Sequence, residues 1–177
     1  PPSYERGIGL YVHIPFCQTK CPYCDFNTYE RIEDQIPNYV DALMNEIKAW
    51  SDLLSRPPVR TIFLGGGTPS YLPIDDIDQI LSTIHSSYKV DESAEITLEC
   101  NPGDVTLERA SGWIGANINR VSMGVQSFND GLLALLGRRH TANEAKRAFR
   151  TLRKAGFRNQ SLDLIYGLPH QSTKQWS

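Results

Sequence analysis

The sequence lacks long apolar runs. No stretch approaches the roughly 18 to 20 consecutive apolar residues that a membrane-spanning helix needs, so we expect no membrane span. The opening Pro-Pro-Ser-Tyr-Glu-Arg also lacks a hydrophobic segment like that of a secretory signal peptide. These absences favour a cytoplasmic protein, with an organelle matrix as the alternative if a transit peptide is missing.

An excess of one charge is absent as well. The 18 basic and 20 acidic residues give a net charge of −2, which argues against a general nucleic-acid-binding surface. With 40% hydrophobic and 21% charged residues, the composition is that of an ordinary soluble protein. Neither a repeat nor a linker divides the chain, so we expect residues 1–177 to form one domain with a substantial core.

Cysteines are few, but they are crowded. Cys17, Cys21 and Cys24 follow one another in C-x3-C-x2-C spacing, and the fourth cysteine, Cys100, lies far downstream. This distribution fits a metal site in a reducing compartment better than a disulfide framework. Two alternatives remain: a zinc-binding interaction module completed by a distant histidine, and a disulfide with a free thiol. Structural zinc usually has four closely spaced ligands, and we expect Cys100 to be a small buried packing residue.

The three-cysteine spacing favours an iron–sulfur cluster. Cysteine thiolates hold such clusters, and short loops between cysteines let several sulfurs converge on one of them. Three protein thiolates leave one iron of a four-iron cluster without a protein ligand. That iron could bind a small molecule.

Patterns typical of strands alternate with patterns typical of helices. The predicted strands cover residues 8–14, 61–64, 94–99, 120–123 and 161–165, and the predicted helices lie around residues 37–50, 74–84, 107–114, 132–136 and 143–155. This alternation predicts about five βα units with a parallel sheet and right-handed crossovers. The sheet could be open and doubly wound, or it could belong to a (β/α) barrel. The five strands leave a sheet edge unpaired, so we expect the chain to be a truncated piece of a longer protein.

Chemically distinctive residues follow the predicted strands. The cysteines follow the first strand, the sequence GGGTP at 65–69 follows the second, Glu99 ends the third, Gln126 follows the fourth and Asp163 lies in the fifth. Both an open doubly wound sheet and a (β/α) barrel place ligands beyond the carboxyl ends of their strands, so we expect these residues to form one common site. Taken singly, the glycines could form only a tight turn, and Glu99 could be a solvated carboxylate.

Two further groups are ambiguous by sequence. Arg138 precedes Arg139 and His140, and the three could equally form a basic cluster on the surface. His13 shares a strand face with Tyr11. We expect His13 to be a core or supporting residue rather than a metal ligand.

Several motifs together resemble one family. The segments are YVHIPFC at 11–17, GGGTP at 65–69, ECNP at 99–102, SMGVQSF at 122–128 and DLIYGLP at 163–169. They are similar to the oxygen-independent coproporphyrinogen III oxidase family of the radical S-adenosylmethionine (SAM) superfamily. The resemblance covers nearly the whole chain. It implies a partial parallel (β/α) barrel and a [4Fe–4S] cluster held by Cys17, Cys21 and Cys24. It also implies SAM contacts at Tyr11, Tyr23, Gly66, Gly67, Thr68, Glu99, Gln126, Arg138 and Asp163; it assigns no catalytic residue.

The family has two main branches, which differ just after the cysteine motif. Its oxidases decarboxylate two propionates of coproporphyrinogen III and carry a further cysteine two residues after the third. This chain has Phe26 there, as in the haem chaperone (HemW-type) branch, which binds haem and passes it to an acceptor protein. The resemblance places the haem-binding motif beyond Ser177. Tyr23 stands where the oxidase branch has phenylalanine, so an aromatic ring is kept.

Overall fold

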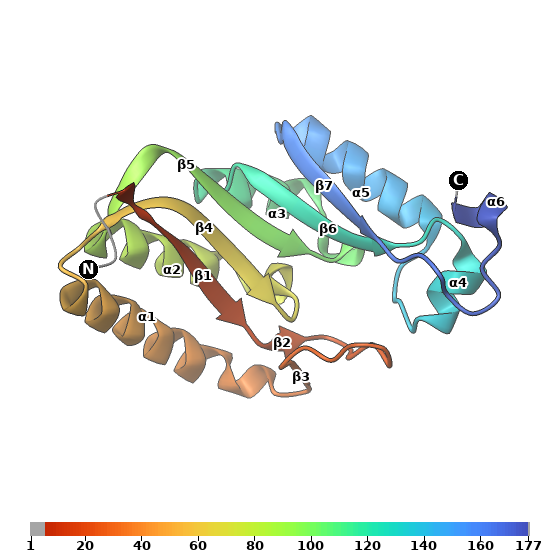
Figure 1. The fold of residues 1–177 in the computed structure, drawn as a ribbon, viewed down its shortest axis with the longest axis horizontal. Helices are drawn as coiled ribbons and strands as arrows, with labels where there is room; N and C mark the ends of the chain where they lie inside the picture. Colours follow the sequence, from red (N-terminus) through yellow and green to blue (C-terminus); the bar gives the residue numbers. More distant parts are fainter. Residues whose placement is uncertain (1–5, 177) are drawn as a thin grey trace.

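The computed structural model describes residues 6–176, which form a curved parallel sheet covered by helices on one face (Figure 1). The strands of the sheet are β1 (Ile8–Ile14), β4 (Pro58–Gly66), β5 (Lys89–Cys100), β6 (Arg120–Gln126) and β7 (Asn159–Leu164), and a separate short pair consists of β2 (Phe16–Cys17) and β3 (Tyr29–Glu30). The longer helices are α1 (Ile36–Leu53), α2 (Ile74–Ser87), α3 (Leu107–Gly115) and α5 (Ala142–Ala155). Short helical turns are η2 (Glu33–Gln35), η3 (Pro69–Tyr71), η4 (Pro102–Asp104), α4 (Asp130–Leu135) and α6 (Thr173–Trp176).

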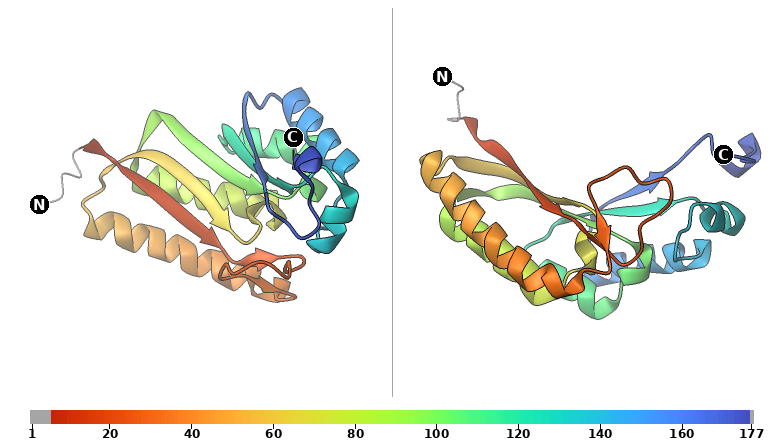
Figure 2. Two further views of the ribbon diagram at one scale, coloured as in Figure 1. Left: turned by 45° about the vertical axis from the view of Figure 1, so that its right-hand side comes forward. Right: turned by 90° about the horizontal axis from the view of Figure 1, so that it is seen from below.

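The strand order distinguishes between an open doubly wound sheet and a (β/α) barrel. The order is β1-β4-β5-β6-β7 and every neighbouring pair is parallel. A doubly wound sheet would reverse direction once and carry helices on both faces. Here the order follows the chain, and α1, α2, α3 and α5 lie together on the convex face (Figure 2). The architecture is therefore a partial βα barrel, and β1 and β7 do not pair within residues 6–176.

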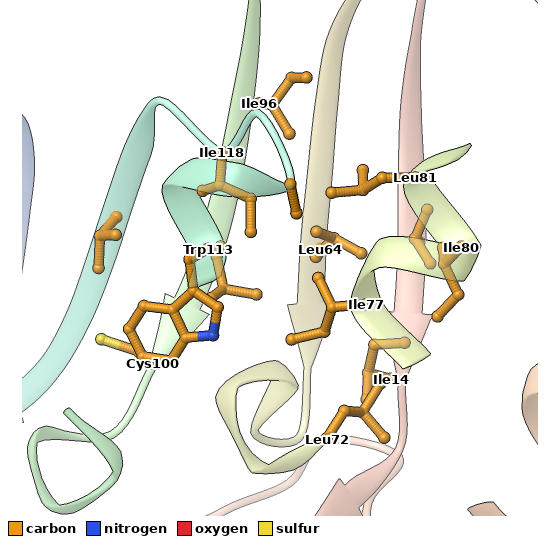
Figure 3. Close-up of a cluster of buried hydrophobic side chains, with 14 of the residues drawn as sticks. Ile14, Leu64, Leu72, Ile77, Ile80, Leu81, Ile96, Cys100, Trp113 and Ile118 are labelled. Carbon is orange, nitrogen blue, oxygen red and sulfur yellow. The ribbon is translucent and has the colours of Figure 1, made fainter. Parts of the chain in front are cut away.

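The hydrophobic core lies between the convex face of the sheet and these helices. Alternate strand residues such as Ile14, Leu64 and Leu98 are fully buried there. Trp113 of α3 and the predicted apolar face of α2 pack against them (Figure 3). Burial of each such side chain stabilises the fold by about 1.5–3 kcal/mol. No helix in the described part of the chain is both long and apolar enough to cross a bilayer.

The element boundaries differ from the sequence prediction in specific places. β4 is longer than residues 61–64 because Gly65 and Gly66 continue its pairing with β1. β5 begins at Lys89 rather than at residue 94, although most of the residues before Ala94 are polar and exposed. The two-residue strands β2 and β3 were not predicted, because two residues are too few to show a periodic pattern.

Helix ends follow local signals more closely. Thr141 and Glu144 form a reciprocal capping box at the start of α5. Gly156 ends that helix with a φ of +120°, and Gly137 follows α4 with a φ of +64°. Both glycines are where the sequence predicted the helices to stop.

Candidate functional site

A hollow of about 160 Å³ lies at the carboxyl ends of the strands. Every residue that the sequence analysis proposed for the site lines it, with the exception of Tyr11. Those lining residues are Cys17, Cys21, Tyr23, Cys24, Gly66, Gly67, Thr68, Glu99, Gln126, Arg138 and Asp163. They come from segments spread over most of the chain, so the sheet brings together what the sequence separates.

The three cysteines lie at the end of β2 and on the loop between β2 and β3. Cys17 is buried at the end of β2, whereas Cys21 and Cys24 are partly exposed. A turn closed by a 3.0 Å hydrogen bond from the Cys24 N–H to the Cys21 carbonyl brings the last two cysteines together. Lys20 fastens the loop to β3, because its N–H donates to Glu30 at 2.7 Å. All four cysteines of the chain are free.

His13 connects β1 to the cysteine loop. Its Nε2 lies 2.9 Å from the Asn27 carbonyl oxygen and its Nδ1 lies 2.9 Å from the Tyr11 hydroxyl. A carbonyl only accepts, so Nε2 carries the hydrogen of the contact with Asn27. Tyr11 is 60% exposed and stacks on Phe63, outside the hollow. The expected shared face of Tyr11 and His13 is thus confirmed, and His13 is a supporting residue.

Gly65 and Gly66 are the last residues of strand β4, and Gly67 follows them in a bend. Gly66 pairs with Ile14 of β1, and the Gly67 N–H donates to the Ile14 carbonyl at 2.8 Å. A Cβ on Gly67 would lie 2.7 Å from the Phe16 carbonyl oxygen and 3.0 Å from the Cys17 sulfur. A Cβ on Gly66, whose φ is +115°, would lie 2.6 Å from the His13 ring. The glycines let β4 approach the cysteine-bearing segment closely.

Glu99 at the end of β5 and Asp163 of β7 bring two carboxylates to the hollow. The Gly66 N–H donates to Glu99 Oε2 at 3.0 Å, and Ser122 donates to Asp163 at 3.2 Å. Burial raises the pKa of Glu99, the Gly66 hydrogen bond opposes this rise, and the charge of Asp163 adds to it. Glu99 is therefore not the freely solvated carboxylate of the alternative interpretation.

Arg138 reaches into the hollow from the segment after α4. One terminal nitrogen donates to the Gly124 carbonyl at 2.6 Å and the other to the Cys21 sulfur at 3.4 Å. Its Nε is buried without a hydrogen-bond partner among the described residues. Burial raises the pKa of Tyr23 to about 12, although the nearby Arg138 charge opposes this rise. The alternative of a basic surface cluster is therefore wrong for Arg138.

Arg139 is a supporting residue that the sequence did not reveal. It forms a 2.6 Å ion pair with Asp104 and also hydrogen-bonds Gln18 beside the first cysteine. Asp104 in turn accepts from Ser70 at 2.6 Å. These contacts join the cysteine loop to the turns after β4 and β5. Their partners are far apart in the chain, and no sequence pattern connects them.

The arrangement fits a cluster better than a single metal ion. Within residues 6–176 no three cysteine, histidine, aspartate or glutamate side chains gather closely enough to hold one ion. A structural zinc site needs four ligands within about 2.0–2.3 Å of one point, and the cysteine motif supplies only three thiolates. An iron–sulfur cluster instead distributes its thiolates over several iron atoms. Three free thiols within one short segment, beside the partly buried cation of Arg138, match that requirement.

The fold and the site together point to one class of proteins: those with a parallel βα barrel and three cysteines after its first strand. The chain belongs to the radical SAM superfamily, since the model of that family matches residues 11–176. It is 42% identical over 174 residues to heme chaperone HemW of Haemophilus influenzae, covering 95% of this chain and 45% of that protein. The HemW of Escherichia coli is 41% identical over 170 residues, with the same coverage. The chain therefore spans less than half the length of these relatives.

Two other comparisons extend this pattern. The zebrafish mitochondrial radical S-adenosyl methionine domain-containing protein 1 is 34% identical, covering 99% of this chain and 39% of that protein. The structure of HemN, the coproporphyrinogen III oxidase of Escherichia coli, matches with a TM-score of 0.87 at 32% identity. That match covers 95% of this chain and 39% of HemN.

Proposed function

We propose that residues 1–177 form the cluster- and SAM-binding core of a haem chaperone. Cys17, Cys21 and Cys24 would hold a [4Fe–4S] cluster, and the rest of the hollow would take SAM. The observation that carries this proposal is the meeting of three free cysteines with two carboxylates and a guanidinium in one hollow.

The charges of the hollow match those of SAM. Its sulfonium and amino groups are cationic, which suits Glu99 and Asp163, and its carboxylate suits Arg138 and the unpartnered Nε. Gln126 and Thr68 add neutral polar groups, and Tyr23 supplies an aromatic surface. Gly66 and Gly67 would offer backbone groups, and Tyr11 would make contact from the rim. When bound and reduced, a cluster of this kind supplies one electron at its open iron.

The haem chaperone assignment rests on Phe26 and on the relatives. Phe26 lines the hollow and is 69% exposed, at the position where the oxidase branch has cysteine. A phenylalanine can neither donate a hydrogen atom as a thiol could nor make thiol contacts. The relatives at 42% and 41% identity are heme chaperones by name. Haem and an acceptor protein would then be the partners of the full-length protein, and its free cysteines suit the cytoplasm.

A coproporphyrinogen III oxidase is the second candidate. The structural match to HemN favours it, because it extends over nearly the whole chain. In that case the same hollow would serve an oxidative decarboxylation. Phe26 is the feature that counts against it.

Two measurements, made one after the other, test the proposal. Anaerobic reconstitution of this chain should yield iron and sulfide near four each per chain, with broad charge-transfer absorption. Zinc alone would overturn the cluster assignment. The full-length protein should then bind haem stoichiometrically and should not convert coproporphyrinogen III with SAM and a reductant. Turnover comparable to that of a genuine oxidase would move the protein to the oxidase branch.

A further inference from the structure

The strand β6 contains an irregularity next to the hollow. Gly124 pairs with Asp163 of β7 and Gln126 pairs with Leu164, so β6 has one extra residue, Val125, between these pairs. Such a bulge redirects the side chains beside it. Here it precedes Gln126, whose side chain lines the hollow.

Gln126 has an unfavourable backbone conformation. Its φ is +68°, and the Ser127 N–H donates to the Val125 carbonyl at 2.9 Å. A hydrogen bond that spans a single residue of positive φ is the mark of a rare, strained γ-turn. A residue with a Cβ keeps such a conformation only where its surroundings hold it.

Two side chains from the segment after α4 hold the irregular strand. Arg138 donates to the Gly124 carbonyl at 2.6 Å, and His140 Nε2 lies 3.1 Å from the Val125 carbonyl oxygen. The two residues therefore hold consecutive carbonyls immediately before Gln126. Arg138 already belongs to the hollow, whereas His140 is 3% exposed and does not line it.

The contact defines the protonation state of His140. The Val125 carbonyl only accepts, so Nε2 carries the hydrogen, and Nδ1 is left buried without a partner among the described residues. Burial, together with the nearby charge of Arg138, lowers the pKa of His140 to about 4. His140 is therefore neutral at physiological pH and remains a hydrogen-bond donor to the strand.

We propose that His140 is a positioning residue for SAM: it holds the Val125 carbonyl, keeps Gln126 in its strained turn and so aims the Gln126 amide into the hollow. The inference rests on the proposed function, because it requires SAM in that hollow. His140 itself touches neither SAM nor the cluster. Its contribution to stability is small, because the hydrogen bond that it makes is offset by a buried nitrogen that has none.

Two substitutions separate positioning from packing. His140→Gln keeps an N–H that can reach the Val125 carbonyl, whereas His140→Leu fills similar space without a donor and without the unpaired nitrogen. Both variants, with Gln126→Ala as reference, are reconstituted anaerobically as the 177-residue chain. SAM affinity is measured by calorimetric titration, and thermal unfolding is followed on the same samples. Nitrogen chemical shifts of the imidazole in the wild-type chain report its tautomer without any cofactor.

We expect the loss of the donor to lower the affinity for SAM without lowering the stability of the fold. His140→Leu should bind SAM about threefold to tenfold more weakly, the effect of one hydrogen bond, while unfolding at no lower temperature than wild type. His140→Gln should stay within about twofold of wild type, because the donor is restored. The imidazole should be the neutral Nε2–H tautomer at pH 6.

Each contrary result is decisive. Wild-type affinity in His140→Leu would overturn the inference, as would an Nδ1–H tautomer or an imidazolium at pH 6. Equal losses of SAM affinity and of stability in both variants would make His140 a packing residue and also overturn it. Absence of SAM binding by the wild-type chain with an intact cluster would instead overturn the proposed function, and the inference with it.

Discussion

The two faces of the sheet differ in chemistry, although they are built from the same strands. On the convex face Ile62, Leu64 and Leu98 are fully buried against helices. On the concave face Thr97 and Glu99 alternate with these apolar residues along β5, and Glu99 lines the hollow. Period-two alternation thus gives stability to one face and leaves the other free for ligands.

Polar residues on the concave face are held by one another rather than by the core. Arg120 donates to Ser161 at 3.0 Å, Ser161 donates to Ser122 at 2.9 Å, and Ser122 donates to Asp163 at 3.2 Å. This chain of donors runs in one direction and ends on a carboxylate. It orients Asp163 toward the hollow and needs no apolar packing to do so. Substitutions on the two faces should therefore affect different measurements.

The largest effect is expected at the cysteine loop. Cys21→Ala should abolish the cluster but leave the fold intact, because the loop lies outside the hydrophobic core. Cys100→Ala, a change in a buried residue of the convex face, should keep the cluster. Bound iron and charge-transfer absorption after reconstitution measure this difference. A full cluster in Cys21→Ala would contradict the assignment of the ligands.

On the convex face the largest effect is on stability. Leu98→Ala should lower the free energy of unfolding by about 3 kcal/mol, because it opens a cavity in the core. Leu107→Ala, at a leucine that is 44% exposed, serves as the matched control and should cost less than about 1 kcal/mol. Urea denaturation measures both. Similar losses in the two variants would mean that the convex face does not carry the stability.

Gly67→Ala should show an intermediate effect that connects the two faces. The added Cβ would meet the Phe16 carbonyl and the Cys17 sulfur, so the strand must shift at a cost of about 1–3 kcal/mol, and cluster occupancy should fall. Gly115→Ala is the control, because nothing lies within 4 Å of its added Cβ. Reconstituted iron content and urea denaturation together report the result. Full iron occupancy in Gly67→Ala would show that β4 can move away from Cys17.

The smallest effect on stability is expected at Glu99, next to Leu98 but on the opposite face. Glu99→Gln should weaken SAM binding about tenfold, because it removes a charged hydrogen-bond partner, while changing the free energy of unfolding by less than about 1 kcal/mol. Calorimetric titration and urea denaturation measure the two quantities. Unchanged SAM affinity would remove Glu99 from the site.

The pH dependence of stability tests the same residue. Burial raises the pKa of Glu99 above its ordinary value of 4.5, so the native state keeps this proton longer than the unfolded state does. Stability should therefore fall as pH rises from 4.5 through the raised native pKa, and Glu99→Gln should lose that fall. Equal pH profiles for wild type and variant would contradict the raised pKa.

The sequence by itself determined the elements and much of the site. Apolar periodicity located the strands and longer helices, and Gly137 and Gly156 marked helix ends, because these signals act over a few neighbouring residues. Parallel strands share one carboxyl edge. The residues after them could therefore be expected to meet, and all the proposed residues except Tyr11 do line the hollow.

Only the tertiary structure decided between the two closures and fixed the supports of the site. These features join segments that are distant in the chain. They are the strand order, the close approach of Gly67 to Cys17, the ion pair of Arg139 with Asp104 and the hydrogen bond of His140 to the Val125 carbonyl. Such contacts depend on how whole elements pack, and local patterns carry no record of them. The sequence identifies the residues that could bind a cluster or a ligand, whereas long-range packing determines how their side chains are oriented.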